Sequence, residues 1–177
     1  MKHNREFEIA FVGLKPGEHV FNYTITDRFF ENFEKPEFTD ANIDVKMTMD
    51  KKQGTFLLKF YINGKVMIPC DRCGDEYEMT LWDEFELLVK QIDDAEVAKK
   101  TEDDAEVAYI ARSESILDVS TWIYEFIVLS VPIQHIHPDD ENGVSTCNPA
   151  VLEILNRQNN EGTHTIWDDL TKVKNKK

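Results

Sequence analysis

The sequence lacks the features that mark several common classes of protein. Its apolar runs stay well short of the roughly 20 residues of a transmembrane helix, so no membrane partner is expected. Residues 1–6 lead into an alternating strand pattern and not into an apolar signal core, which favours a cytoplasmic location. There is no GxGxxG, no Walker loop and no serine–histidine–aspartate arrangement of suitable spacing. We therefore expect a protein that is not an enzyme and has no evident small-molecule substrate.

Cysteine and positive charge are also scarce. The chain has three cysteines, two of them three positions apart, which indicates reduced thiols or metal ligands and not a disulfide framework. It carries 20 lysines and arginines against 34 aspartates and glutamates, a net charge of −14. This charge repels phosphate backbones and attracts partners with a basic surface, although its ordinary effect is solubility.

Period-two alternation dominates the first half of the chain. Apolar residues occupy every second position at 43–49 and again at 56–62, the pattern of half-buried strands. Asn63-Gly64 is a strong hairpin signal, because both central residues of a type I′ turn need positive φ. Residues 66–68 are then expected to form the return strand.

Further elements are expected on both sides of these strands. Residues 77–89 alternate as one long strand, with a bulge or strand exchange near Trp82, and 7–11 and 19–25 predict two earlier strands. Thr26 or Asp27 is suited to cap a short helix.

Helical periodicity replaces the alternation later in the chain. Val119, Ile123 and Ile127 share one helical face, and Pro132 lies beyond the predicted end of this helix. Two shorter helices are expected around 150–156 and 167–174.

The fold class predicted from these patterns is α+β. A mostly antiparallel curved sheet or partly open β-barrel with a CxxC knuckle forms the first half, followed by one long and two short helices. Residues 1–92 are the expected β-rich domain, 93–106 an exposed acidic loop, and 107–177 a helical segment packed on the sheet with a basic C-terminal tail. One compact unit is expected.

The motif Cys70-Asp71-Arg72-Cys73-Gly74 carries the main chemical content. In a zinc knuckle, two thiolates at this spacing bind one tetrahedral ion from a single tight turn. The following Gly74 suits a position that needs positive φ, and a knuckle prefers to lie between two strands. A redox pair would instead open a helix, whereas strand pattern follows Cys73.

One cysteine pair supplies only half of a metal site. The sequence offers His135, His137 and Cys147 as further ligands, and Cys70, Cys73, His137 and Cys147 would make a Cys3His set for structural zinc. Four protein ligands leave no position for a catalytic water, so such a metal stabilises and does not catalyse. The alternative is that the cysteines pack without a metal.

Other candidate residues have ordinary explanations. His19 and His164 are isolated in polar surroundings, which is typical of surface histidines. Trp82, Trp122 and Trp167 lie within apolar patterns, so we expect them to anchor the core or an interface.

Four segments in order resemble the YceD-like family, the large ribosomal RNA subunit accumulation proteins. Residues 66–73, followed by an acidic and aromatic strand, resemble the family's central C-x-R-C segment, and 116–132 resemble its helix ending in L-x-l-P. His137 and Cys147 match histidine or cysteine positions after that proline, and 166–174 resemble the closing W-x-x-L-x-x-L-K. Where many relatives carry a second close cysteine pair, this chain has Cys147 alone.

The resemblance implies a role in the accumulation of large-subunit ribosomal RNA, through processing or early assembly. The implied partner is a ribosomal protein or assembly factor that meets the acidic surface, or pre-ribosomal RNA touched by Arg72 or the lysine-rich tail. The alternative function is a structural-zinc or thiol-redox-sensing protein without a ribosomal role.

Overall fold

The chain folds as two units, each assembled from segments that are far apart in the sequence. The computed structural model describes residues 5–93 and 107–160. The sheet unit contains Met1–Ile68 and Glu78–Ile133, and the knuckle unit contains Pro69–Tyr77 and Gln134–Lys177. In the described parts of the chain, no helix is long and apolar enough to cross a membrane.

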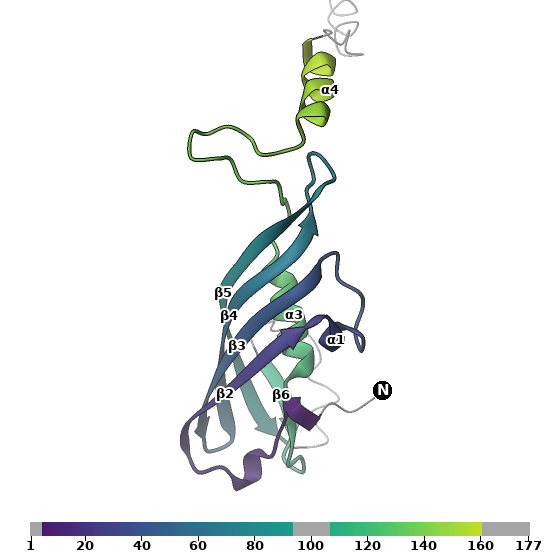
Figure 1. Cartoon of the computed structure of the whole chain (residues 1–177). Coiled ribbons are helices and arrows are strands. Elements are labelled where there is room, and N and C mark those ends of the chain that lie inside the picture. The colour runs from purple at the N-terminus through teal and green to yellow at the C-terminus, as the bar shows by residue number, and fades with distance from the viewer. Residues whose placement is uncertain (1–4, 94–106, 161–177) are drawn as a thin grey trace, which may run out of the picture. The chain divides into compact units, whose positions relative to one another are not determined.

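Five strands form one curved sheet, in the order β2-β3-β4-β5-β6 (Figure 1). Strands β2 and β3 pair antiparallel, as do β3 and β4, whereas β6 runs parallel to β5. The sheet is therefore mostly antiparallel, as predicted, and it does not close into a barrel. The strand bounds are Gly17–Thr26 (β2), Thr39–Lys52 (β3), Thr55–Pro69 (β4), Glu76–Ile92 (β5) and Val107–Ala111 (β6).

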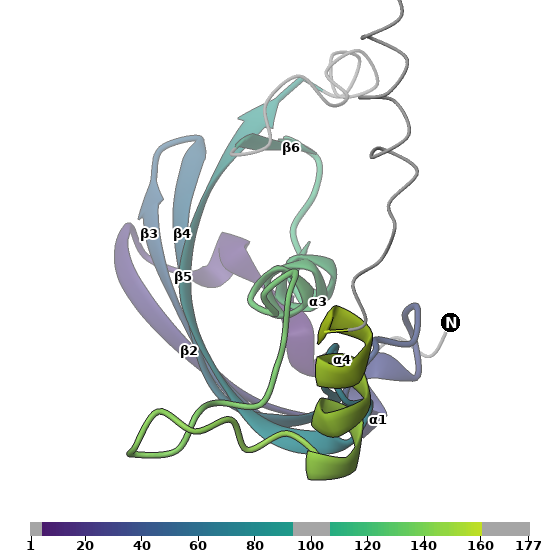
Figure 2. The same ribbon diagram turned by 90° about the horizontal axis from the view of Figure 1, so that it is seen from above.

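Helix α3 (Ser120–Leu129) fills the concave side of this sheet (Figure 2). The alternating residues of the strands turn one face toward it, and Ile123 and Ile127 of the helix are fully buried. Phe126 of this helix packs against two neighbouring strands, with its ring stacked on Phe85 of β5 at 4.5 Å and edge-on to Phe60 of β4 at 4.9 Å between centroids. The strand residues buried in this core include Ile43, Val45, Met47, Met49, Phe56, Leu58, Phe60 and Ile62.

Short strands and helices complete the sheet unit. The strand predicted at 7–11 is only two residues long, β1 (Glu8–Ile9), between the 3-10 turns Arg5–Phe7 and Phe11–Gly13. It pairs antiparallel with β7 (Leu117–Asp118) in a separate two-stranded sheet. The predicted short helix is α1 (Asp27–Phe30).

The hairpin predicted at Asn63-Gly64 is wrong. Strand β4 runs straight through both residues, so 66–68 continue the same strand instead of returning. The burial pattern explains why: Ile62, Val66 and Ile68 face one side in unbroken alternation. A two-residue turn would have reversed that alternation, because the residues on either side of it become cross-strand partners.

Gly64 is needed in β4 for a close backbone approach and not for a turn. A Cβ placed there would lie 2.4 Å from the carbonyl oxygen of Asn42 and 2.5 Å from Cα of Ile43. The opposing strand is irregular nearby, since the pairing register shifts between Thr39 and Asn42 and Asp40 has a φ of 50°. A side chain at Gly64 would push against backbone that has no room to move.

The helices also differ from the prediction. Helix α3 has 10 residues and is not a long helix, whereas α4 (Pro149–Asn160), expected as a short helix, has 12. Strand β6 was not predicted, because its pairing with β5 is parallel and leaves no hairpin signal in the sequence. The loop residues 94–106, the helix expected at 167–174 and the basic tail lie outside the described residues.

We predict that Gly64→Ala destabilises the protein by about 1–3 kcal/mol, since the added methyl group forces neighbouring strands apart. The matched control is Gly13→Ala, where an added Cβ meets nothing within 4 Å and φ is not positive. Urea unfolding of both variants measures the difference, and the control is expected to change stability by no more than about 1 kcal/mol. Equal stability of the two variants would contradict the close approach at Gly64.

Candidate metal centre

The segment between β4 and β5 folds as a tight knuckle. The backbone N–H of Gly74 donates to the carbonyl of Cys70 at 2.8 Å, and the N–H of Cys70 donates to the carbonyl of Asp75 at 3.0 Å. Gly74 has a φ of 79°, in the region that glycine occupies without steric cost. The knuckle therefore lies between two strands and uses glycine as the sequence predicts.

A second segment of the same unit, residues 134–148, brings a histidine and a cysteine to the knuckle. We call it the arm. At its far end the Asp140 carboxylate accepts hydrogen bonds from the N–H groups of Asn142 and Val144, at 2.9 and 2.8 Å. These donors, Val144 first, lower the pKa of Asp140, so this carboxylate stabilises a turn. The chain then doubles back through a bridge between Asp139 and Ser145, which returns Cys147 toward the knuckle.

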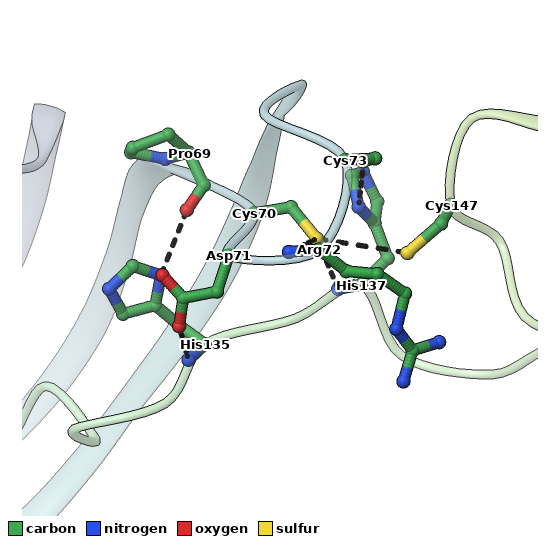
Figure 3. Close-up of polar contacts among 8 residues, drawn as sticks. All are labelled: Pro69, Cys70, Asp71, Arg72, Cys73, His135, His137 and Cys147. Carbon is green, nitrogen blue, oxygen red and sulfur yellow. Dashed lines mark hydrogen bonds and ion pairs between the residues drawn. The ribbon is translucent and has the colours of Figure 1, made fainter. Parts of the chain in front are cut away.

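Four side chains converge where the arm meets the knuckle (Figure 3). The Sγ atoms of Cys70 and Cys147 lie 3.7 Å apart, and Sγ of Cys73 lies 3.4 Å from Nδ1 of His137. All four potential ligand atoms lie within 4.8 Å of one another. The predicted residues Cys70, Cys73, His137 and Cys147 thus form one cluster.

The spacing of the cluster suits a tetrahedral metal ion. With zinc–sulfur bonds of about 2.3 Å and a zinc–nitrogen bond of about 2.0 Å, a tetrahedron places two sulfurs about 3.8 Å apart and a sulfur and a nitrogen about 3.5 Å apart. The two distances observed, 3.7 and 3.4 Å, fall within about a tenth of an ångström of these values. The donor set, three thiols and one imidazole, is one that structural zinc uses, so these residues fit the ion.

Backbone donors prepare Cys70 to act as a thiolate. Burial by itself raises the pKa of this thiol, but N–H groups of His137, Arg72 and Cys73 outweigh burial and lower the pKa to about 6. The N–H groups of Arg72 and His137 each lie 3.4 Å from its sulfur. The thiolate is the form that binds metal.

The Cys73 thiol responds in the opposite direction. The N–H of Asn148 lowers its pKa, but burial and the neighbouring thiols of Cys70 and Cys147 outweigh this and raise it. Adjacent thiols resist simultaneous ionisation because their charges repel, and a bound cation removes that repulsion.

His135 has a different role from His137, although the sequence offered both as ligands. It is only 7% exposed, and its Nδ1 lies 2.8 Å from the carbonyl oxygen of Pro69. Its backbone N–H donates to the Asp71 carboxylate at 2.8 Å, and the N–H of Asp71 donates to the His135 carbonyl at 2.8 Å. His135 and Asp71 therefore fasten the arm to the knuckle beside the cluster (Figure 3).

The knuckle unit has almost no hydrocarbon core. Among its described residues, only Cys70, His135 and Cys147 are buried. The apolar residues of α4 do not compensate, since Val151 and Leu152 are half-buried and Ile154 and Leu155 are exposed. The interior of this unit therefore consists of two cysteines of the cluster and the histidine beside it.

None of the other predicted residues that the structure describes is a member of the cluster. His19, on β2, contacts the carbonyl oxygen of Lys15 through Nε2 at 2.8 Å. Trp82 is 70% exposed on β5, so of the two positions expected for it, the core and an interface, the core is excluded. Arg72 donates to the hydroxyl of Ser145 at 3.1 Å. His164, Trp167 and the tail lysines lie outside the described residues.

The fold and the cluster define an α+β protein with a three-cysteine, one-histidine centre. Residues 58–174 match the sequence model described as large ribosomal RNA subunit accumulation protein YceD. This match covers more than half of the chain, so the chain belongs to the YceD family. No curated protein and no solved structure matches it significantly.

We predict that the purified protein carries about one equivalent of zinc, and that Cys70→Ser and Cys147→Ser each lose it, because the hydroxyl is a poor zinc ligand. Elemental analysis after dialysis against metal-free buffer measures this. His19→Gln is the control: it removes a histidine that is not in the cluster and should retain the metal. Equal zinc content in all four proteins would rule out the assigned ligands.

Proposed function

We propose that the chain supports the accumulation of large-subunit ribosomal RNA as a non-enzymatic factor in its processing or early assembly. The observation that carries the proposal is the family match over residues 58–174. The matched range contains the knuckle, the arm and helix α3, so it includes segments of both units.

In this proposal the metal cluster has a structural role. A zinc ion held by Cys70, Cys73, His137 and Cys147 would have four protein ligands, which leaves no open position for a water or a substrate. Its chemistry would be to neutralise the thiolates and to hold the knuckle and the arm together. The factor then acts by binding, and the ion determines the shape of the knuckle unit.

The proposed partner is a basic ribosomal protein or assembly factor. The net charge of −14 attracts cationic segments at long range and disfavours extended contact with RNA phosphates. Ribosome assembly supplies positively charged partners, because proteins that bind RNA carry basic surfaces.

A thiol-based redox sensor is the second candidate, favoured by one observation. Sγ of Cys70 lies 3.7 Å from Sγ of Cys147, and the pKa of Cys70 is lowered to about 6. A thiolate beside a second thiol can form a disulfide when an oxidant accepts two electrons. Thiol titration before and after mild oxidation, with zinc present, separates the two: reversible loss of two thiols favours the sensor.

We predict that depletion of the protein lowers large-subunit ribosomal RNA relative to small-subunit RNA, and that the wild-type chain restores the ratio. Quantification of both RNAs in depleted cells measures the effect. Cys147→Ser should restore it poorly, because the knuckle unit loses its metal, whereas His19→Gln should restore it fully. An unchanged RNA ratio after depletion would refute the proposed function.

A further inference from the structure

The outer face of the sheet carries an exposed row of side chains along β5. Leu81, Leu87 and Val89 are buried, so the even-numbered residues of this strand point to the other face. The exposed residues of that row are Glu78, Thr80, Trp82, Glu84 and Glu86. A tryptophan thus lies among three carboxylates on a rigid strand, and all of these residues belong to the sheet unit.

Trp82 is the only tryptophan among the described residues that is exposed. With 70% of its surface accessible, it presents an indole ring on a strand whose opposite face is packed in the core. Tryptophan is the side chain most enriched at the energetic centres of protein interfaces, because its ring buries a large area at low entropic cost.

The lysines nearest to this row are already engaged. Lys59 forms an ion pair with Glu86 at 2.5 Å, and Lys65 forms one with Glu78 at 2.6 Å. Within the described residues, Glu84 has no such ion-pair partner. Its carboxylate, which acts on Lys59 only through its charge and not in an ion pair, can therefore pair with a cation from outside.

The same face shows how a cation is held over a ring. Nζ of Lys46 on β3 lies 6.0 Å from the centre of the Tyr61 ring on β4. No described lysine or arginine occupies the equivalent position over Trp82. The indole face is the strongest cation-binding surface among the aromatic side chains.

We infer that the outer face of β5 around Trp82 is a docking site for an arginine-containing segment of a partner protein. The guanidinium group stacks on the indole of Trp82 and forms an ion pair with Glu84, while Glu78 and Glu86 supply negative charge on either side. Charge complementarity identifies this occupant: the row offers carboxylates, and the whole chain carries −14. An RNA strand would meet those carboxylates with its phosphates and be repelled.

This site deepens the proposed function, since it gives the basic partner a location. It is tested separately, because binding to the purified protein does not depend on the ribosomal RNA of a cell. If depletion leaves the RNA ratio unchanged while the purified protein still binds the peptide through Trp82, only the proposed function is refuted. If depletion changes the RNA ratio but the peptide does not bind through Trp82, only the docking site is refuted.

The experiment is a fluorescence anisotropy titration of the full chain with a short labelled peptide of alternating arginine and glycine. Trp82→Ala should weaken binding about tenfold and Glu84→Gln about threefold, because they remove the stacking surface and the charge. The matched control is Val20→Ala, an exposed apolar residue on β2, which should change affinity by less than about twofold. Binding should also weaken with added salt.

Two results would overturn the inference. One is equal affinity of the wild type and Trp82→Ala for the peptide. The other is tighter binding of a labelled single-stranded oligouridine than of the peptide, with that binding lost in Trp82→Ala, which would make the row a base-stacking surface. Circular dichroism of each variant checks that the sheet is intact.

Discussion

Two thiols and one imidazole make up the buried interior of the described knuckle unit: Cys70, Cys147 and His135. So small an interior buries little apolar surface, and burial of apolar surface is the dominant favourable contribution to folding. Small domains of this kind are usually held by disulfides or metal ions. The Cys70–Cys147 and Cys73–His137 distances agree with a tetrahedral ion, so a bound ion would hold the arm to the knuckle in addition to the Asp71–His135 hydrogen bonds. An apolar core, in contrast, would not require Cys73 and His137 to lie close to the two buried cysteines.

The sheet unit has the opposite construction. Its interior is hydrocarbon, with Phe126 of α3 stacked on Phe85 and packed against Phe60. The two units are therefore stabilised by different interactions. Burial of aromatic and aliphatic side chains keeps the sheet, and with it the Trp82 row, rigid regardless of metal. With zinc bound as proposed, the order of the knuckle unit would depend on zinc supply and on thiol redox state, and it could change while the sheet stays folded.

The sequence predicted the sheet well because alternation of apolar residues reports burial directly. It predicted the four cluster residues because cysteine spacing and the histidine after Pro132 are local signals. The prediction failed where the residues that determine the local structure are distant in the sequence. Asn63-Gly64 reads as a turn locally, and only the backbone of β3 opposite Gly64 explains the glycine. The pairing of Asp71 with His135 is likewise set by the fold, since 64 residues separate them. Trp82 was expected to anchor the core or an interface, and its parity along β5 places it on the exposed face.

In the proposed zinc-bound form, the metal ion and not apolar packing holds the knuckle unit together. The most direct test is amide hydrogen exchange of the purified protein with zinc and after chelation. We expect the N–H groups of Cys70, Asp71 and Gly74, which are hydrogen-bonded within the unit, to exchange much faster after chelation. The paired N–H groups of β3 and β4 should keep their protection. Unchanged protection of the knuckle unit after complete removal of zinc would show that the ion does not hold this unit together.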